Sequence, residues 1–221
     1  MVAVLAAAAV AILGWHFAGD TSAGHLDRTI AGDVAMRHGL ARFLGQGFAD
    51  LGDPAPVAVV LVALSALAYV ARGRRGFAFA ILGPLLAMVT TSLVLKPLID
   101  RTRGGDLAFP SGHTTAVGSL ALVAAVLLLG WALVPRALRW VGAIALALVV
   151  VAVGTSLVGR GIHYPTDTVG AVGVVLAVVL LVALVIDAVA DRAALRERGQ
   201  RAGRRSHDEQ EQERPGRGHH P

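Results

Sequence analysis

The sequence predicts an all-α membrane protein, a bundle of six transmembrane helices with one amphipathic helix outside the bilayer. The chain has 221 residues, of which 55% are hydrophobic, and a mean hydropathy of +0.66. This exceeds what an ordinary soluble domain carries. The apolar residues come in long blocks, and a helix of about 20 apolar residues crosses the hydrocarbon core of a bilayer. Ala, Val, Leu and Gly dominate the blocks, and small residues allow close helix packing in lipid.

Six blocks are long enough to span, at roughly residues 1–18, 55–71, 77–96, 112–134, 140–158 and 167–190. We therefore expect one membrane domain over residues 1–190. The first block lacks the preceding Lys or Arg of a signal peptide, so we expect a retained helix rather than a cleaved signal. Residues 191–221 alternate arginine with acidic residues and lack an apolar face, which predicts a disordered tail.

Residues 22–52, between the first two spans, carry a helical pattern of apolar side chains. The spacing is near 3.6 residues with the charged residues Asp27, Arg28, Arg37 and Arg42 between, which predicts an amphipathic helix on the membrane surface. Two roles stay open for this helix: a lid packed on the bundle, or a side wall for a lipid tail. The apolar positions are Leu26, Ile30, Val34, Leu40, Leu44 and Phe48.

Arginines set the predicted orientation. They cluster at 72–75, at 136–139 and after the last span, three places that fall on one side of a six-span bundle. The positive-inside rule makes that side cytoplasmic, which puts both termini inside. Lys96, His113 and His163 then share the outer face, although they are far apart in the sequence.

Composition excludes several classes of protein. The net charge of +5 comes from loops and tail, and no nucleic-acid-binding motif is present, so we expect the bilayer and a lipid as partners. The chain has no cysteine, hence no disulfide and no cysteine-based metal site. We expect no metal and no cofactor. Spans two to five have essentially no ionisable residue, which argues against a transporter.

Three cations close the third span. Lys96 is the only lysine, and Arg103 follows it seven residues later with Arg101 between them. An arginine offers a bidentate fork to two phosphate oxygens, whereas a lysine acts as a point charge. The pattern predicts phosphate binding by Lys96 and Arg103, with Arg101 as a further candidate. Interfacial anchoring is the alternative for such residues taken alone.

The fourth span begins with Pro110-Ser111-Gly112-His113. Ser111 is a good N-cap, and Gly112 lets an anion approach the backbone closely. The free amides of a helix start point at an anion and add a favourable dipole. An ordinary helix start explains Pro-Ser-Gly, but it does not explain a histidine at the membrane boundary directly after it.

The sixth span is preceded by His163, with Asp167 four residues on. On a helix these side chains are neighbours on one face. An aspartate bonded to one ring nitrogen fixes the histidine tautomer and leaves the other nitrogen free to attack phosphorus. Helix capping is the alternative role for this pair.

The three pieces together resemble the three signature motifs of the type 2 phosphatidic acid phosphatase (PAP2) superfamily. They are Lys96-(x6)-Arg103, residues 110–113 and Ser156…His163-(x3)-Asp167. The resemblance covers roughly residues 50–190. It implies a six-helix membrane phosphatase without metal, in which His163 is the nucleophile that forms a phosphohistidine and Asp167 orients it. It further implies that His113 is the general acid. The implied phosphate ligands are Lys96, Arg103, Ser111 and the Gly112 amide.

Two positions depart from the family pattern. Gly104 stands where the first motif usually has proline, and Leu157 stands where the third motif usually has arginine. An arginine occurs three residues later, at Arg160. On a helix this moves the side chain roughly 60° around and about 4.5 Å along the axis, which a long side chain can bridge. We therefore transfer the phosphate-binding role to Arg160.

The resemblance points first to dephosphorylation of a polyprenyl (undecaprenyl) diphosphate, the cell-wall carrier lipid, at the outer membrane face. Phosphatidic acid or phosphatidylglycerophosphate is the alternative substrate. A non-catalytic protein that binds lipid phosphates is a second alternative, which the displaced arginine favours. A vanadate-binding haloperoxidase shares this kind of site, but those enzymes are soluble.

Overall fold

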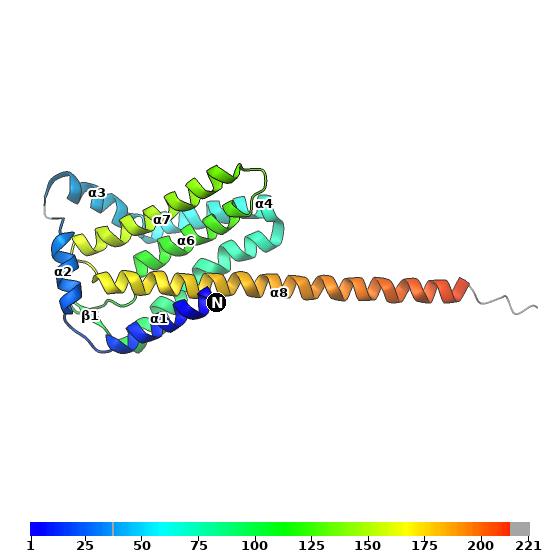
Figure 1. The fold of residues 1–221 in the computed structure, drawn as a ribbon, viewed down its shortest axis with the longest axis horizontal. Helices are drawn as coiled ribbons and strands as arrows, with labels where there is room; N and C mark the ends of the chain where they lie inside the picture. The colour runs from blue at the N-terminus through cyan, green and yellow to red at the C-terminus, as the bar shows by residue number, and fades with distance from the viewer. Residues whose placement is uncertain (37, 213–221) are drawn as a thin grey trace, which may run out of the picture. The chain divides into compact units, whose positions relative to one another are not determined.

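The computed structural model describes residues 1–36 and 38–212, with side chains for all of these except 197–199 and 201–212. The chain divides into two units, residues 1–183 and residues 184–221. The first unit is a bundle of helices (Figure 1) and carries every motif of the sequence analysis. The all-α prediction is confirmed, apart from one short two-stranded antiparallel ribbon.

The elements follow one another in a simple order. Their bounds are α1 (Val2–His16), α2 (His25–Asp33), α3 (Gly39–Asp50), α4 (Pro54–Val89), the π-helix η1 (Thr90–Leu95), α5 (Lys96–Ile99), β1 (Thr102–Arg103), β2 (Asp106–Leu107), α6 (Gly112–Leu129), α7 (Arg136–Gly159) and α8 (Pro165–Gln212).

Four helical segments of the described chain are long and apolar enough to cross a membrane. They are Pro54–Ile99, Gly112–Leu129, Arg136–Gly159 and Pro165–Arg196, and the shorter helix Val2–His16 is also apolar. The structure therefore supports a multi-pass membrane protein, while the number of six crossings stays a prediction.

Helix α4 reverses its direction at Gly73, whose backbone angles (φ 63°, ψ −151°) are not helical. A methyl group added to Gly76 would lie 2.5 Å from the carbonyl oxygen of Ala68. Eight residues of straight helix would separate these positions by about 12 Å. The rings of Tyr69 and Phe77 also meet edge-to-face, with centroids 6.1 Å apart. The single apolar segment Pro54–Ile99 is thus a helical hairpin, and its turn falls where the predicted second and third spans are joined.

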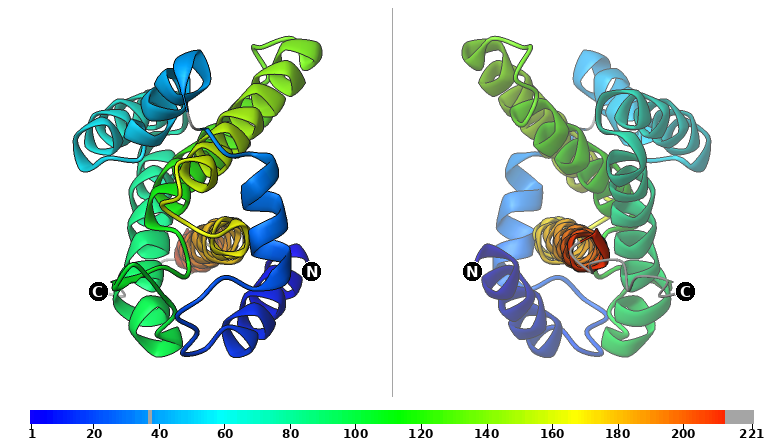
Figure 2. Two further views of the ribbon diagram at one scale, coloured as in Figure 1. Left: turned by 90° about the vertical axis from the view of Figure 1, so that its left-hand side faces the viewer. Right: turned by 90° about the vertical axis from the view of Figure 1, so that its right-hand side faces the viewer.

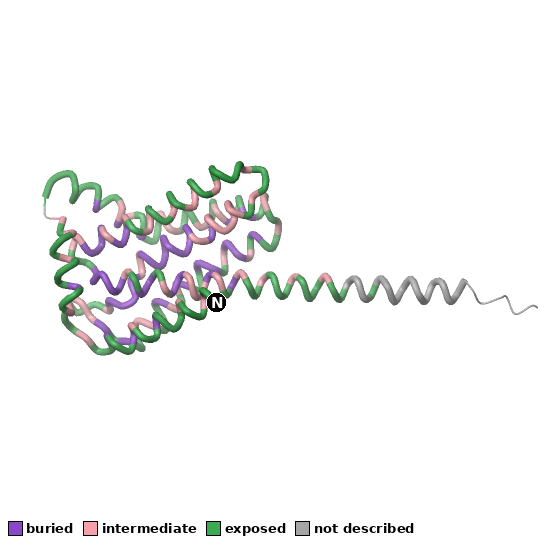
Figure 3. Tube along the Cα trace, in the orientation of Figure 1, coloured by how far each residue is buried: buried purple, intermediate pink, exposed green. Residues whose placement is uncertain are grey.

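Within the first unit, α8 lies between α1 and α2 on one side and α6 on the other (Figure 2). Glycines allow these close contacts. A methyl group on Gly173 of α8 would lie 2.6 Å from Val10 of α1, and one on Gly118 of α6 would lie 3.3 Å from Val175 of α8. Helix α1 is therefore a packed part of the bundle, as a retained helix would be. Figure 3 shows that burial concentrates along α6 and the first part of α8.

The segment 22–52 differs from the prediction. It forms two helices, α2 and α3, rather than one amphipathic helix. Gly39 adopts a positive φ of 69°, and His38 before it is extended, so the helix cannot run through. Asp27, predicted on the polar face, is buried. The prediction of a single surface helix is wrong in its extent, and α2 is part of the packed bundle.

The second unit is the continuation of α8 from Leu184. The predicted disorder from residue 191 is not found as far as Gln212, which is helical. Residues such as Ala193, Ala194, Leu195 and Arg196 are strong helix formers, and this local preference outweighs the lack of an apolar face. Residues 213–221 of the predicted tail lie outside the described residues.

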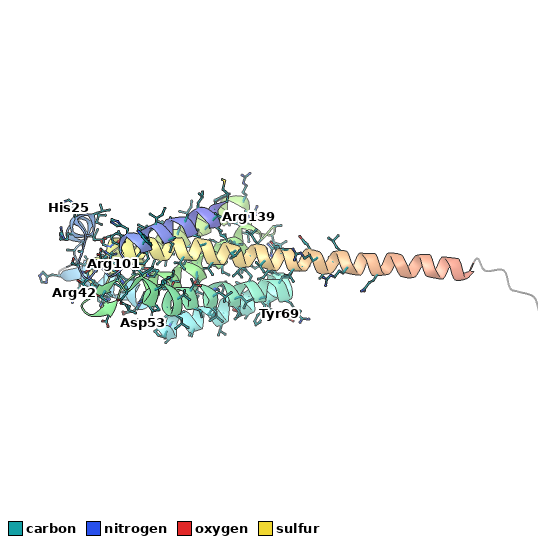
Figure 4. The ribbon with its side chains drawn as sticks, turned by 90° about the horizontal axis from the view of Figure 1, so that it is seen from below. His25, Arg42, Asp53, Tyr69, Arg101 and Arg139 are labelled. Carbon is teal, nitrogen blue, oxygen red and sulfur yellow. The ribbon has the colours of Figure 1, made fainter. Side chains whose placement is uncertain are left out.

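The two ends of the first unit differ in chemistry. Asp53 and Arg101 lie at one end of the bundle, and Tyr69 and Arg139 lie at the other (Figure 4). At the second end, Arg72 donates a hydrogen bond to the Gly130 carbonyl, and Arg139 Nη1 donates to the Leu129 carbonyl at 2.7 Å. These arginines complement the carboxyl end of α6. The first end holds the candidate site.

Candidate active site

The first motif begins where the π-helix η1 ends. Pro97 lacks an N–H group and interrupts the α-helical hydrogen-bond ladder, and the six residues of η1 end at Leu95, two positions before it. Such π-segments recur at functional sites. Lys96 directly follows η1, and its Nζ donates a hydrogen bond to the Leu107 carbonyl at 2.7 Å. The lysine is thereby tied to the β1–β2 ribbon that carries Arg103.

The β1–β2 turn explains one departure from the PAP2 pattern. Gly104 and Gly105 both have positive φ angles, of 62° and 94°. Proline is fixed near a φ of −65° and cannot occupy this conformation. The glycine at position 104 therefore accompanies a tight antiparallel turn.

Arg103, predicted to bind phosphate, packs with one face of its guanidinium on the ring of Tyr164. Its guanidinium carbon lies 4.3 Å from the centroid of the Tyr164 ring. Its Nη1 atom is buried and has no hydrogen-bond partner among the described residues. A buried guanidinium nitrogen without a partner is costly, and an anion is the partner it would take. Tyr164 follows His163, so this cation lies beside the third motif.

Arg101, the further candidate for phosphate binding, has a different place. Its side chain is fully buried and packs between the rings of Phe17 and Tyr164, at 4.1 and 4.4 Å. Its Nη1 donates to Asp167 Oδ1 at 2.7 Å, and its Nη2 donates to Asp27 Oδ2 at 2.6 Å. Two carboxylates already neutralise this guanidinium, so Arg101 is an ion-pair partner of Asp27 and Asp167 rather than a phosphate ligand.

Asp27 is a residue of the site that sequence reasoning missed. It comes from α2, 74 residues before Arg101. Besides the guanidinium, it accepts hydrogen bonds from the Thr166 amide at 3.1 Å and from the Thr166 hydroxyl at 2.9 Å. An acidic residue inside the helical pattern of 22–52 is the one indirect signal in the sequence, but the pattern assigns it to solvent.

The second motif forms the start of α6, as the sequence predicts. Ser111 is the N-cap, and its Oγ accepts from the Thr114 amide at 3.3 Å. Ser111 is fully buried and its hydroxyl serves as a cap, and its contact with phosphate stays a prediction. A methyl group added at Gly112 would meet nothing within 4 Å, which leaves the backbone there open to a ligand.

The second and third motifs meet through the backbone. The Ser111 amide donates to the carbonyl oxygen of Asp167 at 3.1 Å. This bond joins the N-terminus of α6 to the first turn of α8. The two helix starts therefore lie side by side, and their positive dipole ends serve one site.

His113, the second residue of α6, is partly exposed and contacts the N-cap of α4, Asp53. Its Nε2 is 3.1 Å from Asp53 Oδ1. A methyl group on Gly52 would lie 2.6 Å from His113 Cβ, so the backbone of Gly52 presses directly on this side chain. Neither Asp53 nor Gly52 belongs to a recognised motif, and sequence reasoning missed both.

His163 is buried, and its Nδ1 faces Asp167. The distance from Nδ1 to Asp167 Oδ2 is 3.5 Å, which is longer than an ordinary hydrogen bond, and Nδ1 has no hydrogen-bond partner among the described residues. The same Oδ2 accepts from the Tyr164 amide at 2.9 Å. The predicted pairing of these two side chains is present in this looser form. Because Nδ1 faces the carboxylate, Nε2 is the ring nitrogen left for chemistry.

In the third motif, Leu157 occupies the position where the PAP2 pattern has arginine. Leu157 is fully buried in an apolar cluster with Ala49, Val117 and Val153. Its side chain therefore belongs to the core and not to the site. Arg160 is the C-cap of α7 and is half-exposed. Within the described residues, no hydrogen bond or ion pair involves its guanidinium, so its predicted role stays a prediction.

The fold and the site together define a class of protein. In this bundle of apolar helices the starts of α6 and α8 meet, which brings His113, His163 and Asp167 into one region, and Arg103 packs on Tyr164 beside them. A solved structure with this fold is that of a transmembrane PAP2 type phosphatidylglycerolphosphate phosphatase from Bacillus subtilis. The TM-score is 0.67 and the sequence identity is 23%, over 81% of this chain and 93% of that chain. The chain thus has the fold of the transmembrane PAP2 type phosphatases.

Two other comparisons gave no match. No family model matches the sequence, and no curated protein matches it significantly.

Proposed function

We propose that this chain is an integral membrane phosphatase that removes phosphate from a lipid phosphate or diphosphate through a phosphohistidine on His163. One observation carries the proposal: the three motifs converge on the start of α8. Arg103 packs on Tyr164, Ser111 bonds to Asp167, and Asp167 faces His163. The shared fold with a PAP2 type phosphatase supports the same reaction class.

The reaction has two steps in this proposal. His163 Nε2 attacks phosphorus, so an N–P bond forms while the bond from phosphorus to the leaving oxygen breaks. His113 gives its proton to that oxygen. Water then attacks the phosphohistidine and the N–P bond breaks. His113 takes the proton from that water, which restores both histidines and releases inorganic phosphate.

The proposed phosphate ligands are the cations and the open helix start. Lys96 and Arg103 supply positive charge, and the amide of Gly112 points at the phosphate from the N-terminus of α6. Arg160 is the proposed replacement for the arginine that Leu157 displaces. In this proposal they stabilise the charge of the transferring group.

For the substrate we propose undecaprenyl diphosphate first, because the sequence resemblance points to enzymes that recycle this carrier. Phosphatidylglycerophosphate is the second candidate, and the described activity of the Bacillus subtilis protein favours it. Phosphatidic acid belongs to the same alternative. Both classes present a phosphate group on an apolar tail.

We propose that the site faces the outside of the cell and that both termini are cytoplasmic. Arg139 and Tyr69 lie at the end of the bundle opposite to Arg101 and Asp53 (Figure 4). The arginine-rich turns at 72–75 and 136–139 are cytoplasmic by the positive-inside rule.

The test is phosphate release by detergent-purified protein, with EDTA present throughout. The three lipids are undecaprenyl diphosphate, phosphatidylglycerophosphate and phosphatidic acid, and His163→Ala is the blank. We expect release that the variant lacks, undiminished by EDTA, and the rates rank the substrates. In rapid-quench experiments with radioactive phosphate, the wild type should be labelled, and a labelled His163→Ala protein would contradict the assigned nucleophile.

A lipid-phosphate-binding protein without turnover is the second candidate, and the burial of Leu157 favours it. It predicts saturable binding of the same lipids with no phosphate released by folded protein. The release assay therefore separates the two candidates.

A further inference from the structure

Three charged groups meet in the interior of the bundle at the start of α8. The Arg101 guanidinium lies between the carboxylates of Asp27 and Asp167, and all three side chains are buried. Burying charges is costly unless each is paired and hydrogen-bonded. By the geometry described above, Arg101 and Asp27 are not phosphate ligands. Phosphate binding therefore does not explain why these two charged side chains are buried.

The hydrogen bonds divide the guanidinium between two acceptors. Nη1 serves Asp167 Oδ1, while Nη2 serves Asp27 Oδ2. Arg101 therefore contacts only one oxygen of Asp167. The other oxygen, Oδ2, is the one that faces His163 Nδ1.

Without Asp27, the guanidinium would have a single carboxylate. An arginine fork binds a lone carboxylate through both oxygens, which is its preferred geometry. In that arrangement Arg101 competes with His163 for Asp167 Oδ2. The Nδ1-protonated tautomer of His163, which leaves Nε2 free, loses its acceptor.

We propose that Asp27 is a positioning residue for the reaction. By holding Nη2 of Arg101, it confines Arg101 to one oxygen of Asp167 and leaves the other oxygen to the Tyr164 amide and His163. Thr166 completes this arrangement, since its hydroxyl lies 2.6 Å from Arg101 Nη1 and 2.9 Å from Asp27 Oδ1. The expected effect of Asp27 on turnover rests on the proposed function. The expected effect of Asp27 on the tautomer of His163 does not.

The first test compares Asp27→Asn with Asp33→Asn, a matched change at an exposed position on the same helix. Loss of the hydrogen-bonded partner of a metal-bound histidine costs about 10- to 100-fold in activity, and we take the same scale for a residue that orients His163 through Arg101 and Asp167. We expect a loss of that order in kcat for Asp27→Asn and none for Asp33→Asn. Equal kcat in both variants would overturn the proposal.

A double-mutant cycle tests whether Asp27 acts through Arg101. If it does, Asp27→Asn has no further effect on kcat in an Arg101→Gln background. Independent roles give losses that multiply, because the free-energy changes then add. Multiplying losses would contradict the proposed route.

The third test reads the histidine itself and needs no turnover. Nitrogen-15 NMR of histidine-labelled protein in detergent reports the ring tautomer, and His163→Gln assigns the signal. We expect the Nδ1-protonated form in the wild type and in Asp33→Asn, with the Nε2-protonated form gaining in Asp27→Asn. An unchanged tautomer in folded Asp27→Asn would overturn the proposal even if the wild type released no phosphate.

Thr166→Val keeps all three charges and removes only the hydroxyl shared by Asp27 and Arg101. It serves where Asp27→Asn does not fold. We expect the same change in tautomer to a smaller extent. A wild-type tautomer in this variant, together with an unfolded Asp27→Asn protein, would assign Asp27 to folding alone.

Discussion

The Nε2 atom of His113 lies 3.1 Å from Oδ1 of Asp53, which joins the second motif to the N-terminus of α4. This pair has no counterpart among the sequence motifs, and the two residues are 60 positions apart. The carboxylate gives the partly exposed imidazole a fixed partner. If His113 is the general acid, its orientation depends on a residue outside the recognised motifs.

Asp53→Asn should therefore lower kcat, because the ring loses its anionic partner but keeps a neutral one. Removal of a general acid costs about 10²–10⁴-fold, and the loss in Asp53→Asn should be smaller than that in His113→Asn. Phosphate release measures both. Asp50→Asn is the control, since Asp50 bonds to Gln46. A wild-type rate in Asp53→Asn would show that the contact does not matter for the reaction.

Gly52→Ala should impair the same histidine by contact alone. The added methyl group would lie 2.6 Å from His113 Cβ, so one of the two side chains must move. Gly47→Ala adds the same group in α3, where nothing lies within 4 Å. We expect a kcat loss of at least tenfold for Gly52→Ala only, since small misplacements of reacting groups cost up to about 10²-fold. Matched activity in the two alanine variants would disprove the argument.

Leu157→Arg restores the arginine of the PAP2 pattern and should nevertheless harm the protein. Its side chain is 0% exposed and lies among Ala49, Val117 and Val153. A charge buried there without a partner costs several kcal/mol. We expect a lower unfolding temperature in detergent and no gain in turnover, with Leu157→Met as the tolerated control. A stable and faster Leu157→Arg enzyme would instead mean that the arginine reaches the site.

Arg160→Ala should lower turnover by orders of magnitude without lowering the unfolding temperature. Arg160 is half-exposed at the C-cap of α7 and makes no hydrogen bond or ion pair with other described residues. Its loss should therefore affect a bound phosphate and not the fold. Arg42→Ala, at an exposed position on α3, is the control. Near-normal turnover in Arg160→Ala would remove this residue from the site.

The absence of cysteine allows a direct test of orientation. Single cysteines at Arg42 and Leu133 report on opposite ends of the bundle, and Leu133 is 88% exposed. A membrane-impermeant maleimide applied to intact cells should label Arg42→Cys and leave Leu133→Cys unlabelled until the cells are broken. The reverse pattern would place the site on the cytoplasmic side.

Residues within motifs could be predicted from the sequence, whereas their partners could not. Lys96, Ser111 and Asp167 lie at the ends of apolar segments, and segment ends meet at membrane faces, so their approximate placement follows from the pattern. Asp27 and Asp53 come from helices with no motif, and their partners are fixed only by packing. Periodicity placed Asp27 in solvent because the spacing of apolar residues carries no information about buried polar partners such as Arg101 and Thr166.

Arg101 shows a second limit of sequence reasoning. A list of cations near a phosphate motif does not tell which of them is already neutralised, since that depends on carboxylates from α2 and α8. Leu157 shows the opposite case. Its departure from the family pattern is visible in the sequence, but only the structure shows that the Leu157 side chain packs in a buried apolar cluster.

The buried position of Arg101 also bears on how the protein is made. Its guanidinium is enclosed by Phe17 and Asp27 from the beginning of the chain and by Tyr164 and Asp167 from much later. A nascent chain synthesised only to the end of α7 still lacks Tyr164 and Asp167, two of these four contacts. The burial of this charge must therefore await synthesis of the start of α8. Neither half of a chain cut between α6 and α7 contains all four partners of Arg101, but the two halves expressed together do.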